Sequence, residues 1–219
     1  SIITFSQLLM EKDVADDIKE DLTLVNSEAR RTAGIVKNLL TFARKHAPVK
    51  QAYQINSVIE DIMKLRAYEQ KLNNIKVITQ FDTHLPDIMI NRFQIQQVVL
   101  NIMINAEYAM LEAHNKGTLT ITSKRTNNHV IVTFSDDGAG ISNENISQMF
   151  NPFFTTKEVG KGTGLGLFIS YNLVTEVDGT IELESEPGSS IHDHRSRSRP
   201  ASAPHRARPP GAFPPCSPG

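Results

Sequence analysis

A seam of apolar residues runs through the first fifth of the chain and constrains its fold more than any other feature. Its members are spaced three and four residues apart: Val14, Ile18, Leu22, Val25, Ala29, Thr32, Val36, Leu39 and Ala43. This heptad pattern predicts one long helix, which Pro48 closes. Apolar residues at 2–9 predict the end of a preceding helix, joined through the polar stretch 11–17. Residues 1–47 are therefore predicted to form an antiparallel helical hairpin.

The apolar seam needs a partner, because a lone hairpin buries such a stripe poorly. A homodimer in which two hairpins form a four-helix bundle would bury it. In the alternative, the long helix packs against the next domain of the same chain. The sequence alone leaves both arrangements open.

Composition excludes several classes of protein. The 219 residues carry 23 Lys+Arg against 24 Asp+Glu, which is not the basic balance of a nucleic-acid-binding domain. The one cysteine, Cys216, excludes an internal disulfide and a cysteine-based zinc site. No run of 18 apolar residues is present, so we expect this segment to make no membrane contact, although a longer parent protein could be anchored. We expect a cytoplasmic protein.

Residues 189–219 differ in composition from the rest of the chain. They hold seven of the 11 prolines and five arginines, and they leave residues 1–188 with a net charge of about −5. With few large apolar side chains, this tail is predicted to be disordered. A basic arm for nucleic acid or anionic lipid is one interpretation, and a solvated extension without function is the other. We favour the second and expect no nucleic-acid partner.

Residues 54–188 are predicted to form a second domain after a linker at 48–53. Helical patterns cover 55–72, 92–114 and 165–177, and strand patterns cover 75–81, 87–90, 118–124, 130–136 and 180–184. Asn127 and Asn128 indicate a hairpin turn between two of the strands. The fold class predicted for the chain is α+β. The second domain is expected to be an α/β sandwich with helices on one face of a largely antiparallel sheet.

Polar side chains form one stripe on the predicted helix 92–114, at Gln97, Asn101, Asn105 and Tyr108. Amide oxygens are hard ligands that suit Mg²⁺ without adding negative charge beside phosphate oxygens. A solvated helix face would show the same pattern. The stripe alone is therefore weak evidence for a metal site.

The predicted strand 130–136 ends in Asp136, and Gly138 and Gly140 follow it. Glycines at these positions let the backbone turn tightly and approach a flat ligand closely. A carboxylate at the end of a strand can accept a hydrogen bond from an exocyclic amine such as that of adenine. An ordinary hairpin turn is the alternative.

A glycine-rich segment at 160–167, GKGTGLGL, precedes the last predicted helix. Backbone N–H groups in such a loop can bind an anion at a helix N-terminus. The segment is neither a Walker P-loop nor a dinucleotide fingerprint, because the required spacing and a surrounding parallel βαβ unit are missing. Before it, residues 150–157 place aromatic side chains and Lys157 on a short loop. A flexible structural loop and a hydrophobic plug are the alternatives for these two segments.

Taken in order, these segments resemble the ATP-binding domain of sensor histidine kinases, and especially the nitrogen-regulator group. Residues 101–106 are similar to the N box of that family, 136–140 to the G1 box, 150–157 to the F box and 162–167 to the G2 box. The broader superfamily, with the Bergerat fold, includes gyrase B, the Hsp90 chaperone and MutL. The resemblance covers roughly residues 1–188.

The resemblance implies that the cofactors are ATP and Mg²⁺. Adenine would lie against Asp136, Asn105 and Asn101 would hold the metal, and residues 160–166 would close over the triphosphate as a lid. The implied nucleotide-binding residues are Asn101, Asn105, Tyr108, Asp136, Gly138, Gly140, Ile141, Phe153, Thr156, Lys157, Lys161, Gly162, Thr163, Gly164, Leu165, Gly166 and Leu167.

The implied reaction is transfer of the γ-phosphoryl group to a histidine on the dimeric bundle, and then to an aspartate of a response-regulator receiver domain. In the family the acceptor histidine precedes a segment like residues 1–6, and none of the seven histidines here has that context. We therefore assign no catalytic residue and expect that this chain alone cannot autophosphorylate. The family also continues beyond residues 180–184 into one more apolar strand. Here the tail follows, which predicts an unpaired sheet edge.

Three hypotheses of different classes remain. The chain is the kinase core of a sensor histidine kinase, an ATP-binding and dimerisation module without transfer activity, or an ATPase clamp like gyrase B. The helical hairpin argues against the clamp. A separate hairpin bearing the histidine would distinguish the first two, because only a kinase would form acid-labile phosphate on it.

Overall fold

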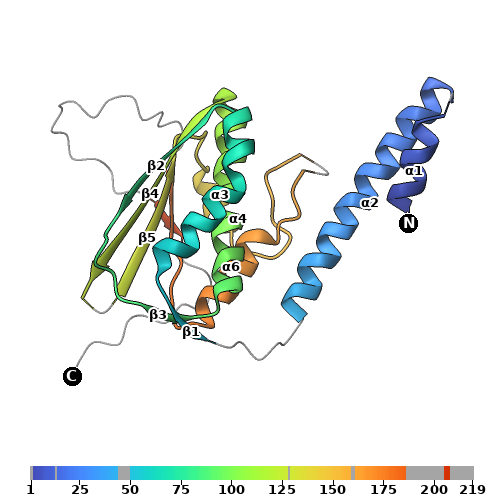
Figure 1. Ribbon diagram of the computed structural model, residues 1–219. Coiled ribbons are helices and arrows are strands. Elements are labelled where there is room, and N and C mark those ends of the chain that lie inside the picture. The colour runs from blue at the N-terminus through green and yellow to red at the C-terminus, as the bar shows by residue number, and fades with distance from the viewer. Residues whose placement is uncertain are drawn as a thin grey trace. The chain divides into compact units, whose positions relative to one another are not determined.

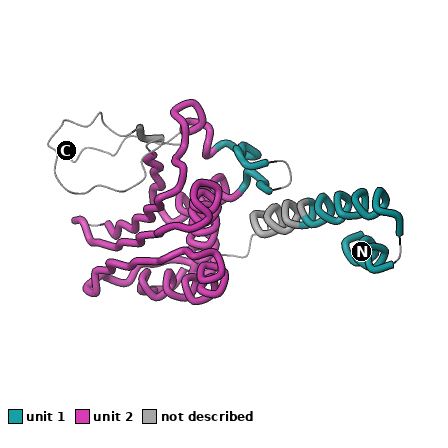
Figure 2. The backbone as a smooth tube through the Cα atoms, turned by 90° about the horizontal axis from the view of Figure 1, so that it is seen from above, with its two compact units in different colours: residues 1–47, 151–165 teal, residues 48–150, 166–219 magenta. Residues whose placement is uncertain are grey.

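The computed structural model describes residues 2–12, 14–43, 50–127, 129–158, 161–185 and 205–207. They fall into two compact units (Figure 2). The first unit combines Ser1–Ala47 with Asn151–Leu165, and the second combines Pro48–Phe150 with Gly166–Gly219. In the described part of the chain, no helix is long and apolar enough to cross a membrane.

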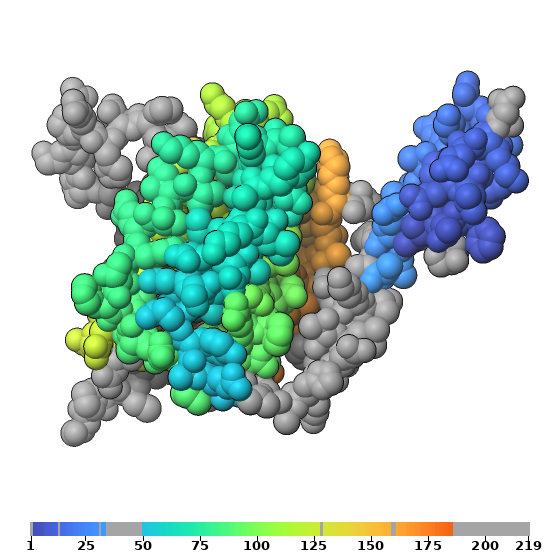
Figure 3. All heavy atoms as spheres, viewed as in Figure 1, coloured from blue at the N-terminus to red at the C-terminus, as the bar shows by residue number. Residues whose placement is uncertain are grey.

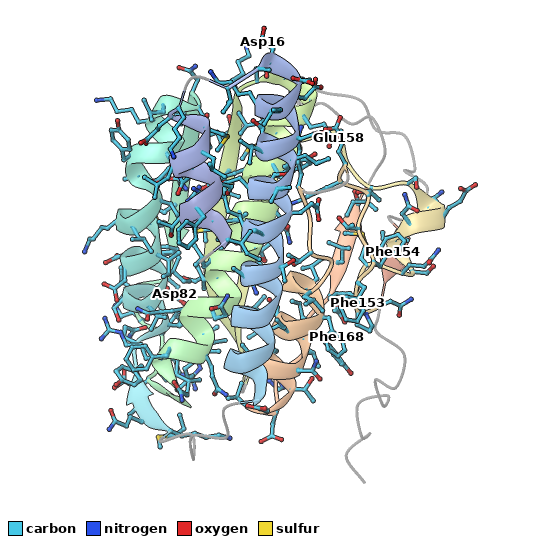
Figure 4. The ribbon with its side chains drawn as sticks, turned by 90° about the vertical axis from the view of Figure 1, so that its right-hand side faces the viewer. Asp16, Asp82, Phe153, Phe154, Glu158 and Phe168 are labelled. Atoms are coloured by element: carbon cyan, nitrogen blue, oxygen red, sulfur yellow. The ribbon has the colours of Figure 1, made fainter. Side chains whose placement is uncertain are left out.

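The first unit contains the predicted hairpin, formed by α1 (Ile2–Met10) and α2 (Asp16–Ala43) (Figure 1). Asp16, labelled in Figure 4, begins α2, where negative charge interacts favourably with the helix dipole. A buried polar contact joins the helices, since the Asn26 amide donates to Ser6 Oγ at 2.7 Å and to the Ile3 carbonyl at 2.9 Å. Because Ser6 and Asn26 are only 4% and 7% exposed, a shifted register would leave them buried without partners.

Part of the apolar surface of the hairpin stays exposed. On α2, Ile18 and Val25 of the seam are 49% and 47% exposed, and on α1 Ile2 and Phe5 are 66% and 67% exposed. The side chains of the seam from Val36 onward lie outside the described residues. Large apolar side chains on both helices are therefore available for a contact.

The second unit begins with a short antiparallel ribbon. Strand β1 (Gln51–Tyr53) pairs with β3 (Ile88–Ile90), and Gln51 lies opposite Ile90. This corrects the prediction of a linker over 48–53, because residues 51–53 belong to a sheet. A strand of three residues is too short to show an alternating pattern in the sequence.

The main sheet has the strand order β2-β4-β5, with β2 spanning Ile75–Phe81, β4 Gly117–Thr126 and β5 His129–Asp136. β4 and β5 form the expected antiparallel hairpin. Asn127 in its turn has a φ of 50°, and Asn128 lies outside the described residues. β2 and β4 are parallel, which corrects the expectation of a largely antiparallel sheet. The reason is the long connection through the helix between them, since parallel neighbours require a crossover of this kind.

Two helices, α3 (Ile55–Leu72) and α4 (Arg92–His114), cover one face of the main sheet (Figures 1 and 3). Inward-facing residues of β4 alternate with outward-facing threonines, as expected for a sheet with one covered face. The core between helices and sheet includes the fully buried side chains of Val58, Ile59, Met103, Met110, Leu119 and Ile121.

Both ends of α4 are capped. At its start, Asn91 Oδ1 accepts hydrogen bonds from the N–H groups of Phe93 and Gln94 at 3.0 and 3.4 Å. At its end, Asn115 adopts a left-handed conformation with a φ of 55°, and its N–H donates to the Leu111 carbonyl at 3.0 Å. The helix that carries the asparagine stripe therefore has defined limits.

The remaining elements of the second unit are short: α5 (Asn143–Ile146), α6 (Gly166–Thr175), β6 (Leu183–Ser185) and β7 (His205–Ala207). Ile146 and Phe150 form a second apolar cluster, on which Tyr171 of α6 packs with its ring centroid 6.1 Å from that of Phe150. This cluster connects the segment after β5 to α6 and β6.

Strand β7 corrects two expectations about the tail. It pairs antiparallel with β6, Leu183 lying opposite Ala207, so residues 205–207 have regular structure and β6 has a partner. A strand ladder is formed by backbone groups, so a segment without large apolar side chains can supply it. The other residues of 189–219 lie outside the described part of the chain.

Candidate functional site

The turn after β5 holds Asp136 at the edge of the main sheet. Asp136 is the last residue of β5, and its carboxylate accepts a hydrogen bond from the Gly138 N–H at 3.0 Å. Asp137 is held on two sides. Its Oδ1 accepts from the Thr118 N–H at 2.8 Å, and its carbonyl oxygen lies 3.0 Å from His114 Nε2. The turn is therefore fixed to β4 and to the end of α4, while Asp136 keeps an exposed side.

The surroundings of Asp136 raise the pKa of its carboxyl group above the usual value. Loss of hydration is the main cause, the hydrogen bond from Gly138 opposes the rise, and the charge of Asp137 adds to it. Although the residue is exposed on one side, protein atoms on the other side keep water from much of the carboxylate. A hydrogen-bond donor that reaches the carboxylate from solvent would replace part of this lost hydration.

Gly138 brings this turn into direct contact with α4. A Cβ on Gly138 would lie 2.7 Å from Ala109 Cβ and 2.8 Å from the Ala109 carbonyl carbon, closer than real side chains approach. Gly140 has a φ of 72°, a conformation that favours glycine. These are the two uses of glycine that the sequence indicates here: a close approach and a turn.

The asparagine stripe of α4 meets the start of α6. Asn101 Nδ2 donates to the Gly166 carbonyl at 3.1 Å and to Ser170 Oγ at 3.3 Å. Asn105 lies one turn further along α4, with its Nδ2 4.0 Å from the position that a Cβ of Gly166 would take. Tyr108 is half-buried on the same stripe. The structure therefore brings together residues that are about 60 positions apart in the chain.

Two residues that the resemblance assigns to the nucleotide site pack in the second apolar cluster. Ile141 and Leu167 both contact this cluster, and the Ile141 N–H donates to Ser185 Oγ at 2.8 Å. The structure thus provides a packing role for both of them. Their contact with a nucleotide stays a prediction.

The other predicted site residues belong to the first unit, in the loop that carries Phe153, Phe154 and Glu158 (Figure 4). The Phe153 N–H donates to the Gly164 carbonyl at 2.9 Å, and a Cβ on Gly164 would overlap the Phe153 backbone. Gly164 has a φ of 65°. Glycine is therefore required where the two arms of the loop meet, and Phe153 remains 63% exposed.

Lys161, on the same loop, lies on the surface. Lys161 forms an ion pair with Glu158 at 2.7 Å, and this hydrogen bond and charge lower the pKa of Glu158. Lys157 and Thr156 lie on the preceding arm, where Thr155 Oγ1 accepts from the Lys157 N–H at 3.2 Å.

Local contacts also hold the end of the loop, at residues 162–165. Thr163 Oγ1 accepts from the N–H of Leu165, which is 2% exposed. A Cβ on Gly162 would overlap Thr155 Oγ1. Gly160, part of the predicted glycine-rich segment, lies outside the described residues.

Comparison with known proteins identifies an ATPase-type domain over the residues that form this site. The family model of the histidine kinase-, DNA gyrase B- and HSP90-like ATPases matches residues 90–194, which include α4, the Asp136 turn and α6. Sporulation kinase C of Bacillus subtilis (strain 168) is 32% identical over 190 residues, covering 86% of this chain and 42% of that protein. This chain spans less than half the length of the curated relatives that it matches first.

Solved structures give the same result. The nucleotide-free catalytic domain of histidine kinase ThkA is 30% identical, with a TM-score of 0.50 over 57% of this chain and 81% of that one. ThkA in complex with response regulator protein TrrA has a TM-score of 0.64 over 85% of this chain and 53% of that one. At 23% identity, the second likeness shows the fold alone. This chain belongs to the sensor histidine kinases and carries their ATPase-type domain.

Proposed function

We propose that the second unit binds ATP with Mg²⁺, as the kinase core of a protein that phosphorylates a histidine and then a response-regulator aspartate. The observation that carries the nucleotide site is the Asp136 turn. It combines a poorly hydrated carboxylate, exposed on one side, with a glycine in backbone contact with α4. This arrangement suits a base with an exocyclic amine, because the carboxylate can accept its hydrogen bond and Gly138, without a side chain, lets the turn lie directly against α4.

The residues around Asn105 fit the metal that the family implies. No cluster of three or more His, Cys, Asp or Glu residues that could hold a metal ion occurs in the described parts of the chain. Mg²⁺ often binds through one or two protein oxygens, with phosphate oxygens and water completing its shell. Asn105 supplies a neutral amide oxygen, and Asn101 lies one turn before it. The bound ion would neutralise charge on the phosphates during transfer.

The chain's own contribution to the reaction is binding and orientation. Asp136 would hold the base at the end of β5, and Asn105 would fix the triphosphate end against α4. Phosphoryl transfer depends mainly on such positioning and on charge stabilisation. The contacts of Phe153, Thr156, Lys157 and residues 161–165 with the nucleotide rest on the resemblance alone.

We propose two protein partners. The exposed apolar side chains of α1 and α2 support a homodimer through the hairpin, since two copies could cover each other's seams. ThkA, whose catalytic domain is 30% identical to this chain, has been solved in complex with response regulator protein TrrA, and this supports a receiver domain as the second partner. We assign the acceptor role to none of the seven histidines of this chain.

Thermal unfolding with and without ATP and Mg²⁺ tests the nucleotide site. At about 100 times its dissociation constant, a ligand stabilises the folded state by about 2.7 kcal/mol. For a chain of this size we expect Tm to rise by about 5–10 °C. Asp136→Asn should remove most of the rise, because the amide can turn a donor toward the exocyclic amine and leaves no charged acceptor.

The control for this experiment is ATP with excess EDTA, which should give a smaller shift if Asn105 binds through the metal. A shift of equal size in the wild-type chain and in Asp136→Asn would place the nucleotide elsewhere. No shift at all, from a chain that unfolds cooperatively, would contradict the proposed function.

A further inference from the structure

A chain of hydrogen bonds joins α4 to α6 beside the proposed triphosphate end of the site. Gln97 Nε2 donates to Asn101 Oδ1 at 3.0 Å, and Asn101 Nδ2 donates to the Gly166 carbonyl and to Ser170 Oγ. Ser170 Oγ in turn donates to the Gly166 carbonyl at 2.9 Å. Two helices distant in sequence are therefore connected through one amide group.

The bonds on both sides of Asn101 fix the orientation of its amide. Gln97 offers a donor, so Asn101 must present its oxygen to Gln97 and its nitrogen to α6. Ser170 is 0% exposed, and water cannot replace it as a partner. Both ends of the Asn101 amide are therefore committed, its oxygen to Gln97 and its nitrogen to α6.

Gly166, whose carbonyl accepts hydrogen bonds from Asn101 and Ser170, lies at a junction in the chain. It is the first residue of α6 and the point where the second unit resumes after the loop of the first unit. A Cβ on Gly166 would lie 3.8 Å from Asn101 Cγ and 4.0 Å from Asn105 Nδ2. Any shift of Gly166 on α4 would therefore change the surroundings of Asn105 directly.

We infer that Gln97, Asn101 and Ser170 are positioning residues that hold the start of α6 against α4 and thereby set affinity for the triphosphate of ATP. The inference rests on the proposed function and deepens it. The base end of the site lies elsewhere, at Asp136 and Gly138, where the contact with α4 is through Ala109. Loss of the hydrogen bonds among Gln97, Asn101 and Ser170, which we call the anchor, should therefore weaken binding of the triphosphate and leave binding of the nucleoside unchanged.

The test compares Ser170→Ala with Thr175→Ala in the full 219-residue chain. Thr175 is a matched control on the same helix, since its Oγ1 donates to the Tyr171 carbonyl at 2.8 Å in the same i−4 pattern but is exposed. We expect Ser170→Ala to raise the dissociation constant of ATP with Mg²⁺ about 3- to 10-fold, as loss of a buried hydrogen bond does. Adenosine affinity should stay unchanged, and Thr175→Ala should change neither value.

A second variant tests whether the hydrogen bond from Gln97 to the Asn101 amide also contributes to ATP binding. Gln97→Met removes the donor on the other side of Asn101 with little change in volume, so it should also weaken ATP binding and spare adenosine. In the double variant with Ser170→Ala, the total effect should be smaller than the product of the two, because both act through Asn101.

Different results would overturn different claims. If the unaltered chain binds ATP and Ser170→Ala binds it equally well, the positioning role is wrong and the proposed function stands. If ATP and adenosine affinities fall together, the anchor is only structural. If the unaltered chain binds no ATP, the proposed function fails, and this inference fails with it.

Discussion

Replacing Gly138 with alanine is expected to abolish measurable ATP binding, with a loss of affinity of about 100-fold or more. The added Cβ would lie 2.7–2.8 Å from Ala109 and from Asp136 Oδ1. One of these contacts is with the backbone of α4, which cannot move aside as the end of a flexible side chain can. The turn must therefore shift away from α4, and Asp136 moves with it. Loss of the hydrogen bond from the base to the charged carboxylate would account for an effect of this size.

The control for this variant is Ala139→Ser in the same turn. Ala139 is exposed, so an added hydroxyl meets solvent and should leave ATP affinity within about twofold. Calorimetric titration of both variants with ATP and Mg²⁺ gives the two dissociation constants. Wild-type affinity in Gly138→Ala would show that the turn takes no part in binding.

The largest effect on stability is expected from Arg66→Met. Glu107 on α4 is 4% exposed, and its carboxylate accepts from Arg66 Nη2 at 2.5 Å and from Gln70 Nε2 at 2.8 Å. The hydrogen bond with Glu107 is also the main reason that the pKa of Arg66 is raised. Without Arg66, a buried carboxylate keeps one neutral donor. The free energy of unfolding should fall by about 3 kcal/mol, which lowers Tm by about 6–12 °C.

Two further variants show whether the buried charge is the cause. Lys64→Met makes the same replacement on the exposed side of α3 and should change Tm by no more than about 2 °C. The double variant Arg66→Met with Glu107→Leu removes both charges and should recover most of the loss, since an apolar pair can replace a buried ion pair. Equal melting of Arg66→Met and Lys64→Met would contradict this explanation.

The long elements could be predicted from the sequence almost to the residue. The helical patterns at 55–72 and 92–114 coincide with α3 and α4, and the strand pattern at 75–81 coincides with β2. In each of these the apolar period repeats several times, so one irregular position does not hide it. β1, α5 and β7 have three or four residues each and show no period. The parallel pairing of β2 with β4 also escaped prediction, because local patterns do not determine which strands become neighbours.

The residues of the site also divide into those with a local sequence pattern, which could be predicted, and those without one. Asp136, Gly138 and Gly140 stand out because one short turn requires all three, and the structure places them in that turn. Ser170, beside the site, and Arg66, in the buried ion pair with Glu107, were missed because their partners lie 69 and 41 positions away. A serine in a helix or an arginine on a helix face has no local signature of such a contact. Asn101 was identified from its stripe, but its hydrogen bonds with α6 are visible only in the structure.

The proposed nucleotide site depends above all on whether Asp136 recognises the amino group of adenine. Inosine triphosphate carries a carbonyl oxygen where ATP carries this amine, so the carboxylate would face a second acceptor. We expect the wild-type chain to bind ATP with Mg²⁺ at least about tenfold more tightly than inosine triphosphate. In Asp136→Asn this preference should disappear. Equal affinity of the wild-type chain for the two nucleotides would contradict the assignment of the base to Asp136.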